Sequence, residues 1–324
     1  MPKLLRSLFV AAAALLCLAA AAQAAAPKAK TQAPGYYRVQ LGQIEVTALF
    51  DGVIDLDTKL LKNTTPEELD RLLARLFVGN PNMSTAVNAY LVNTGKKLVL
   101  IDTGVGAYRG PALGHVMENL RAAGVTPAQV DIVVLTHMHG DHVGGLTDAS
   151  GKARFPKALV MVAQEEADYW LSQETAGGGP KPPQLFAKFA RDMAAPYIAS
   201  GRWQTFAKGS VIVPGVTAVP AFGHTPGHTA YAIESEGQKL LICGDLVHAH
   251  AVQFVRPGVA IMFDADQAQA IATRRAIFKD VAAGGYLLGD MHLPFPGIGH
   301  VRADGEDAYG WVPVEFAPLK APAK

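Results

Sequence analysis

Hydrophobic and polar positions along the chain follow two alternating patterns. Short runs rich in valine, leucine and isoleucine are typical of buried β-strands, whereas apolar residues spaced three or four positions apart predict helices. Strands are expected at 37–41, 44–50, 87–92, 97–102, 131–135, 158–162, 211–213, 216–219, 230–233, 239–243 and 286–288. Because both halves of the chain contain strands and helices, the pattern predicts one α/β domain with two layers of sheet between helices.

Capping residues mark where the helices are expected to begin. Thr65 is the predicted N-cap of a helix that starts at Pro66, with Glu68 closing a capping box. The apolar face of this helix is expected to carry Leu69, Leu72, Leu73 and Leu76. Further helices are predicted at 115–123, 164–171, 185–193 and 266–282.

Glycine and proline mark the breaks between these elements. Asp51-Gly52 predicts a turn directly after the strand at 44–50. The Gly/Pro-rich segment 176–183 predicts a flexible loop, and long flexible loops commonly cover functional sites. The last residues, 317–324, are expected to be frayed.

The N-terminus has the pattern of a secretory signal peptide. Lys3 and Arg6 precede an Ala/Leu-rich apolar run at 8–22, and Ala-x-Ala cleavage patterns follow within 22–26. A retained membrane anchor is the alternative, but the run is short and alanine-rich. We therefore expect a signal peptide at 1–26, a disordered linker at 27–35, one catalytic domain at 36–316, and a periplasmic or secreted protein without a stable membrane anchor.

Composition narrows the range of partners. The 29 basic and 28 acidic residues nearly cancel, and no basic stripe is visible, so no nucleic-acid partner is expected. Cleavage of the signal peptide would remove Cys17 and leave Cys243 as the single cysteine, which excludes an intramolecular disulfide. The expected partner is a small-molecule substrate, and a homodimer is left open.

A dense group of ionisable side chains follows the strand at 131–135. His137, His139, Asp141 and His142 form the pattern H-x-H-x-D-H. Side chains alternate along an extended chain, so the first two histidines should point the same way, and Gly140 permits a sharp turn that brings the others back. Imidazole and carboxylate groups together are typical ligands of zinc and related metals, rather than of calcium or magnesium.

Other candidate ligands also follow predicted strands, and such strand ends gather along one edge of a sheet. They are Asp102, His224 and His228 in the segment G-H-T-P-G-H-T, Asp245, His248 and His250, and His292 with His300 further on. The spacing alone does not decide which of these side chains bind a metal.

The H-x-H-x-D-H segment resembles the signature of the metallo-β-lactamase-fold hydrolases, and five motif blocks follow the family order between about 39 and 314. The resemblance implies an αββα four-layer sandwich with two metal ions and a water or hydroxide between them. It assigns one metal to His137, His139 and His224, and the other to Asp141, His142 and His292. Asp245 is the implied bridging carboxylate and proton carrier, and Asp102 is implied to support the site from behind the ligands.

The resemblance also ranks the candidate histidines as metal ligands. It favours His224 over His228 and His292 over His300 as ligands. His248 and His250 are interpreted as pocket wall or supporting residues, and Cys243 as core. The best-known zinc β-lactamases have cysteine at the position of Asp245 and no carboxylate at that of Asp141, so this chain departs from that class.

A narrower resemblance concerns the substrate. The segments 245–248, 251–254 and 292–300 are similar to methyl parathion hydrolase and its exported relatives, a group that includes acyl-homoserine lactonases. The implied activity is hydrolysis of a lactone or ester, with organophosphate triester hydrolysis as the alternative; a β-lactamase, a thioesterase or a non-hydrolytic iron protein is less favoured. Zinc is the expected metal, with manganese, cobalt and iron as alternatives. Trp170, Phe186 and Phe189 are the candidate apolar wall.

Overall fold

The computed structural model describes residues 28–108, 110, 112–172 and 183–319. The chain divides into a short unit, Met1–Pro34, and one compact unit, Gly35–Lys324, which contains every element below. The expected signal peptide and residues 176–182 of the Gly/Pro-rich segment lie outside the described residues. No helix within the described ranges is long and apolar enough to span a membrane.

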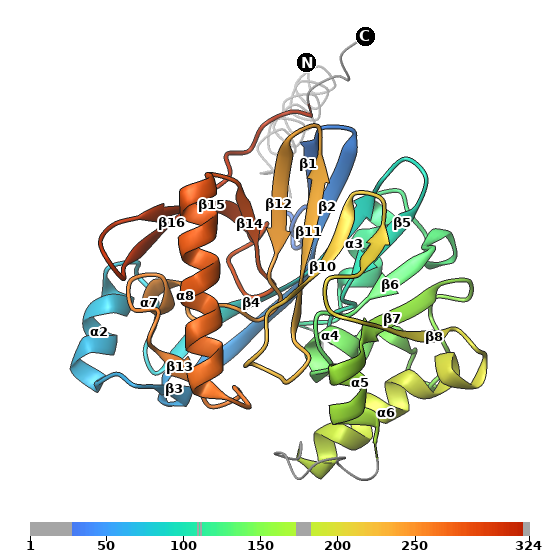
Figure 1. Ribbon diagram of the computed structural model, residues 1–324, viewed down its shortest axis with the longest axis horizontal. Helices are drawn as coiled ribbons and strands as arrows, with labels where there is room; N and C mark the ends of the chain where they lie inside the picture. Colours follow the sequence, from blue (N-terminus) through green and yellow to red (C-terminus); the bar gives the residue numbers. More distant parts are fainter. Residues whose placement is uncertain (1–27, 109, 111, 173–182, 320–324) are drawn as a thin grey trace, which may run out of the picture. The chain divides into compact units, whose positions relative to one another are not determined.

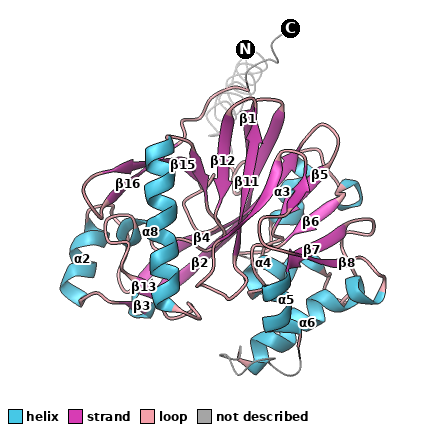
Figure 2. Ribbon diagram, in the orientation of Figure 1, coloured by secondary structure: helices cyan, strands magenta, loops and turns pink. Residues whose placement is uncertain are grey.

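Two seven-stranded sheets form the centre of the compact unit (Figures 1 and 2). The first sheet has the order β1 (Tyr36–Leu41), β2 (Ile44–Asp57), β4 (Asn82–Asn93), β5 (Leu98–Ile101), β6 (Ile132–Val134), β7 (Leu159–Ala163) and β8 (Trp203–Phe206). The second has the order β16 (Tyr309–Pro313), β15 (Ile298–Ala303), β14 (Leu287–Gly289), β12 (Gln238–Ile242), β11 (Thr229–Ser235), β10 (Val216–Pro220) and β9 (Val211–Val213). A small two-stranded sheet pairs β13 (Ala260–Ile261) with β3 (Leu61–Lys62).

Helices cover the outer faces of both sheets (Figure 1). The α-helices are α2 (Pro66–Ala74), α3 (Val116–Ala122), α4 (Gly140–Val143), α5 (Gln164–Leu171), α6 (Gln184–Ala199), α7 (His250–Gln253) and α8 (Gln267–Gly284). Short 3-10 turns occur at η1 (Thr58–Leu60), η2 (Pro127–Gln129) and η3 (Gly144–Leu146).

The alternation of side chains along β4 shows why the sheets are layered in this way. Ala89 and Leu91 point into a core shared with α3, α5 and α6. Tyr90 and Val92, one position along, point into a second core between the two sheets. A third core lies between the second sheet and α8, so the order is helix, sheet, sheet, helix. The predicted αββα sandwich is therefore confirmed.

Capping and burial also explain the helix at α2. The Thr65 hydroxyl accepts a hydrogen bond from the Glu68 backbone N–H, and Pro66 occupies the first helical position, as predicted. The return bond of the capping box does not form, because the Glu68 carboxylate binds Thr64 and Arg256 instead. Leu76, expected on the apolar face, lies beyond the end of this helix and is half exposed.

The predicted turn at Asp51-Gly52 is wrong. β2 continues through both residues, and its register with β4 shifts between Phe50 and Gly52, which makes a β-bulge. Gly52 has a φ of +146°, a conformation that glycine adopts without strain. The bulge turns the Asp51 side chain inward, where its carboxylate accepts hydrogen bonds from the backbone N–H groups of Val105 and Val116.

Two further elements differ from the sequence-based expectations. The helix expected at 185–193 continues to Ala199 through Pro196. The chain beyond the last predicted strand forms β15 and β16, which extend the second sheet at its edge.

Candidate metal centre

The H-x-H-x-D-H segment begins just after the carboxyl end of β6, an inner strand of the first sheet. Thr136 is held there by Asp102, which accepts hydrogen bonds from the Thr136 backbone N–H at 2.8 Å and its hydroxyl at 2.7 Å. His139 then caps α4, and Gly140 is the first residue of that helix. The tight turn brings His142 back toward His137, with 4.0 Å between the ring centroids.

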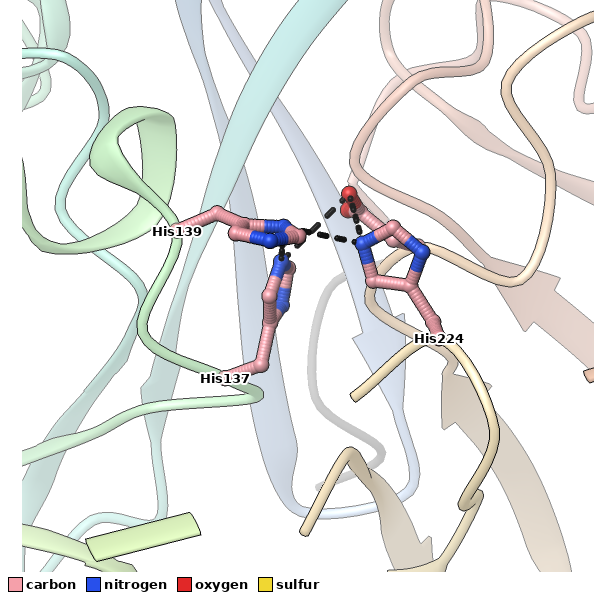
Figure 3. Close-up of side chains that lie close together, drawn as sticks. His137, His139 and His224 are labelled. Carbon is pink, nitrogen blue, oxygen red and sulfur yellow. Dashed lines mark hydrogen bonds and ion pairs between the residues drawn. The ribbon is translucent and has the colours of Figure 1, made fainter. Parts of the chain in front are cut away.

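Three histidines face one another across the two sheets, and we call them the three-histidine cluster: His137, His139 and His224. The first two come from the loop after β6 and the third from the loop between β10 and β11 (Figure 3). His139 Nδ1 lies 2.9 Å from His137 Nε2 and 3.0 Å from His224 Nε2. The nearer oxygen of Asp245 lies 3.5 Å from His137 Nε2 and 3.2 Å from His224 Nε2.

Asp141, His142 and His292 form a second cluster next to the first. His142 Nε2 lies 3.8 Å from an oxygen of Asp141, and His292 Nε2 lies 3.6 Å from the other oxygen. Asp245 again reaches this cluster, at 3.0 Å from His142 Nε2 and 3.2 Å from His292 Nε2. Asp245 therefore stands between the two clusters, as the bridging role requires.

Two atoms at this point have no hydrogen-bond partner although both are buried. They are His142 Nε2 and Asp245 Oδ1, which lie 3.0 Å apart without hydrogen-bond geometry. Buried polar atoms are rarely left unpaired, and a cation bound by both would satisfy them. In each cluster the ligand atoms lie within 4.8 Å of one another. The donor set therefore fits two divalent cations of the zinc type.

The electrostatics of the site reflect this crowding of donors. Burial, together with the neighbouring His142, lowers the pKa of His137 well below its usual value. Burial alone would also lower the pKa of His142, but the carboxylates of Asp245, Asp141 and Asp102 outweigh it and raise that pKa. Burial would raise the pKa of Asp245, but the surrounding imidazoles hold it well below its usual value. The imidazoles around Asp245 thus favour the charged form of its carboxyl group.

Most of the ligand imidazoles are fixed by a partner on their other ring nitrogen. His142 Nδ1 lies 2.7 Å from Asp102, His224 Nδ1 lies 2.8 Å from Asp264, and His292 Nδ1 lies 2.8 Å from the Ala86 carbonyl oxygen. Such partners set the ring orientation and the tautomer of a metal ligand. Asp102 therefore occupies the supporting position expected for it, with a φ of +59° at the end of β5.

Asp264 and Glu166 were missed by sequence reasoning. Asp264 is a buried carboxylate between β13 and α8, and Glu166 is completely buried in α5. Each lies three residues after a strand, Glu166 after β7 and Asp264 after the short β13, but neither belongs to a recognised motif, so nothing in the local sequence distinguished it from other acidic residues.

The four histidines left open have different positions. His228 is buried behind the site; its Nδ1 contacts the Ala221 carbonyl and its Nε2 accepts a hydrogen bond from the Asp245 N–H. His248 lies within the site, with its Nε2 3.1 Å from Asp245. His250 is partly buried at the start of α7, and His300 is exposed on β15.

A cavity of about 390 Å³ opens above the two clusters. Its floor contains His139, Asp141, Asp245, His248 and His292. Its walls are mostly apolar and are formed by Ile54, Leu56, Val105, Tyr108, Leu185, Phe186, Phe189 and Phe263, with Thr85 and Gly140. Among the described residues that line it, none is lysine or arginine.

The interpretation of Trp170 as part of the pocket wall is wrong, whereas Phe186 and Phe189 do line the cavity. Trp170 is 1% exposed and lies behind the site. Its indole N–H donates to the Glu166 carboxylate, and its ring packs edge-on against His139. Phe263 also lines the cavity, and sequence reasoning did not single it out.

The fold and the site define an αββα protein with two adjoining His/Asp clusters on the floor of an apolar pocket. The family model of the metallo-beta-lactamase superfamily matches residues 84–283, and the chain belongs to this superfamily. The matched region includes His137, His139 and His224 and the strands that precede them. His292 lies beyond the matched region.

Curated relatives match over parts of their length. The lactamase-like protein vrtG of Penicillium aethiopicum is 30% identical over 193 residues, which is 58% of this chain and 50% of that protein. An atrochrysone carboxyl ACP thioesterase of Passalora fulva is 38% identical over 84 residues, 25% of this chain and 24% of that protein. The chain thus spans half or less of the length of these two relatives.

Two solved structures match over nearly their whole length. The hydrolase AbOPH of the beta lactamase superfamily has 38% sequence identity and a TM-score of 0.84, and the match covers 89% of this chain and 100% of that one. AidC, a dizinc quorum-quenching lactonase solved with an acyl-homoserine product, has 26% identity and a TM-score of 0.79, covering 88% and 99%. The predicted fold and superfamily are confirmed, and these neighbours are hydrolases, the enzyme class that the sequence predicted.

Proposed function

We propose that the protein is a dinuclear metal-dependent hydrolase that acts on a lactone or an ester. The observation that carries the proposal is the position of the two metal-binding clusters on the floor of an apolar cavity that is open to a small molecule. The dizinc lactonase among the structural neighbours supports the same reading.

His137, His139 and His224 would hold one cation, Asp141, His142 and His292 the other, and Asp245 would contact both. Two such cations lower the pKa of a water molecule and polarise the oxygen of the bond that is attacked. We propose zinc as the resident metal, because imidazole and carboxylate ligands suit it, although manganese, cobalt and iron accept the same donors.

The protein's own groups bind and orient the substrate. The apolar walls, with Phe186, Phe189 and Phe263, would hold an acyl or aryl group and exclude water around it. Asp245 is one of two carboxylates at the metal-binding end of the cavity, and it would take up a proton from the attacking water and pass it to the departing group. Asp102 contacts Nδ1 of His142 and so keeps the imidazole ring of His142 directed toward the other metal-binding side chains.

Hydrolysis of a neutral organophosphate triester is the second candidate. The lining of the cavity, without lysine or arginine among its described residues, suits an uncharged triester as well as a lactone. We further propose that the protein is exported and that a small molecule is its partner.

The test is a side-by-side assay of a long-chain acyl-homoserine lactone and methyl paraoxon, with metal content measured beforehand. We expect efficient lactone opening and weak triester turnover. The reverse preference would move the protein to the triester hydrolases, and neither activity in protein with two bound metals would contradict the proposed substrates.

A pair of variants tests whether the clusters carry the reaction. His137→Ala should lose bound metal and lower kcat/KM more than about 100-fold, because a direct ligand matters at least as much as the groups behind it. His300→Ala, which changes an exposed histidine on β15, is the matched control and should behave like the wild type. Full activity in metal-depleted His137→Ala would exclude the proposed mechanism.

A further inference from the structure

Glu166 is a completely buried carboxylate that the proposed chemistry does not use. It lies in the first turn of α5 and does not line the cavity. None of the described lysine, arginine or histidine side chains forms an ion pair with it. A buried charge of this kind requires other compensation.

Four hydrogen-bond donors compensate the carboxylate, two on each oxygen. One oxygen accepts from the Met138 backbone N–H at 2.9 Å and from the Trp170 indole N–H at 2.6 Å. The other accepts from the Thr225 hydroxyl at 2.7 Å and from the Gly227 backbone N–H at 3.0 Å. Three of the four partners are N–H groups, which can only donate, so the carboxyl oxygens act as acceptors for both loops, although burial raises the pKa of Glu166 above its ordinary value.

Three of the four donors belong to the two loops that carry the three-histidine cluster, and the fourth, Trp170, lies in α5 itself. Met138 lies between His137 and His139, in the loop after β6 of the first sheet. Thr225 directly follows His224, in the loop before β11 of the second sheet. One carboxylate therefore connects the ligand loops of two separate sheets.

Two further contacts make this connection tight. A Cβ atom added at Gly227 would lie 2.1 Å from the Glu166 backbone nitrogen, so that loop packs directly on α5. Trp170, held by Glu166, contacts the ring of His139 edge-on, with 5.3 Å between the ring centroids. Thus both the loop positions and one ligand ring depend on the same carboxylate.

The second cluster has separate support. His142 is held by Asp102, and His292 by the Ala86 carbonyl and, through its backbone N–H, by Asp290. No hydrogen bond among the described residues joins Glu166 to these groups. A change at Glu166 should consequently affect one cluster and spare the other.

We propose that Glu166 is a positioning residue that sets the geometry of the three-histidine cluster and not that of the second cluster. It acts through the loops and through Trp170, and touches neither ligand atoms nor the cavity. The inference rests on the proposed metal centre.

The test is Glu166→Gln, which keeps the shape of the side chain but turns an amide NH2 group toward donors. Zn²⁺ binding is measured by competition with a chromophoric chelator, and Co²⁺ binding by its visible absorption, in the full protein. Reference variants His224→Ala and His292→Ala each remove a ligand of one cluster and provide the spectrum of each remaining site. Glu165→Gln, at the neighbouring residue, is the matched control.

We expect Glu166→Gln to bind one ion with wild-type affinity and the other about 10- to 100-fold more weakly. Its Co²⁺ spectrum should resemble that of His224→Ala, and Glu165→Gln should match the wild type. Wild-type affinity for both ions in folded Glu166→Gln, equal weakening of both, or a spectrum like that of His292→Ala would overturn the proposal.

If Glu166→Gln does not fold, two further variants each remove one donor: Thr225→Val keeps the shape of the side chain, and Trp170→Phe keeps an aromatic ring but a smaller one. Both should weaken the same ion, by less than the glutamine variant would, and unchanged binding in both would overturn the proposal. Wild-type protein that binds no metal would instead contradict the proposed metal centre itself, so the two failures are distinguishable.

Discussion

The buried carboxyl group of Asp51 makes the stability of the protein depend on pH independently of the metal site. Burial raises its pKa above the ordinary 3.8, more than the backbone N–H donors at Val105 and Val116 lower it. As the pH rises from 3.8 toward that higher value, the unfolded chain loses this proton before the folded protein does. The free energy of unfolding contributed by Asp51 therefore decreases across this window and is constant above it.

The prediction compares Asp51→Asn with Asp131→Asn. Relative to the wild type, Asp51→Asn should become more stable as the pH rises from below 4 through the window.

Asp131 has the opposite shift, because the Leu98 N–H and Lys97 lower the pKa of its carboxyl group. The stability that Asp131 contributes is therefore present above the usual pKa and is lost in acid. Asp131→Asn should thus lose stability relative to the wild type with rising pH. Urea unfolding of chelator-treated proteins over a pH series measures both slopes, and slopes of the same sign would contradict the assignment.

At the residue scale, the sequence predicted the metal ligands better than their supports. His137, His139 and Asp141 were identifiable because they share one short motif after a buried strand. Asp245 was identifiable because it directly follows another buried strand. Glu166 and Asp264 act through hydrogen bonds to residues about 30 to 60 positions away. Such contacts form only when segments distant in the sequence come together in the folded domain, so local sequence patterns do not reveal them.

At the scale of elements, the β-bulge in β2 is a required feature of the structure. A Cβ atom added at Gly52 would lie 2.1 Å from the Ala112 carbonyl oxygen, and the φ of +146° is itself unfavourable for any other residue. Gly52→Ala should therefore destabilise the protein by about 2–4 kcal/mol, the sum of backbone strain and overpacking. A melting experiment should show a decrease in Tm of roughly 5–10 °C.

Gly95→Ala is the control for this prediction. Gly95 also has a positive φ, of +76°, but no atom lies within 4 Å of its added Cβ. Replacing Gly95 by alanine should lower the free energy of unfolding only by the strain of the left-handed conformation, about 1–2 kcal/mol. Equal Tm values for the two variants would show that the close approach to Ala112 is not present.

Elements with strong local signals were predicted from the sequence, and weak edge strands were not. β5, β6 and β12 are apolar runs buried on both faces, which gives them a clear pattern. β15 and β16 contain glycine, arginine and proline and lie at the edge of their sheet, where such residues are tolerated. Asp51-Gly52 has the composition of a turn, but pairing with the long β4 holds it in the sheet.

At the scale of the whole molecule, the metal centre joins the loops of both sheets. Four ligands, His137, His139, Asp141 and His142, lie in the loop and short helix after β6, whereas His224, Asp245 and His292 lie in loops of the second sheet. Ions bound only by the folded state stabilise it by mass action, by about 2.7 kcal/mol at a free concentration 100 times the dissociation constant. The αββα order was predictable because the motif blocks occur in the order of the family, but the substrate is decided by the shape of the cavity, which no motif encodes.

The proposed hydrolysis depends on two metal ions bound by these clusters. The most direct measurement is the metal content per chain of the purified protein, followed through chelation and re-addition of Zn²⁺, with lactone hydrolysis and Tm recorded at each stage. We expect two ions per chain, loss of hydrolysis and a lower Tm after chelation, and recovery of both when two equivalents are restored. Undiminished hydrolysis in protein that contains no metal would contradict the proposal.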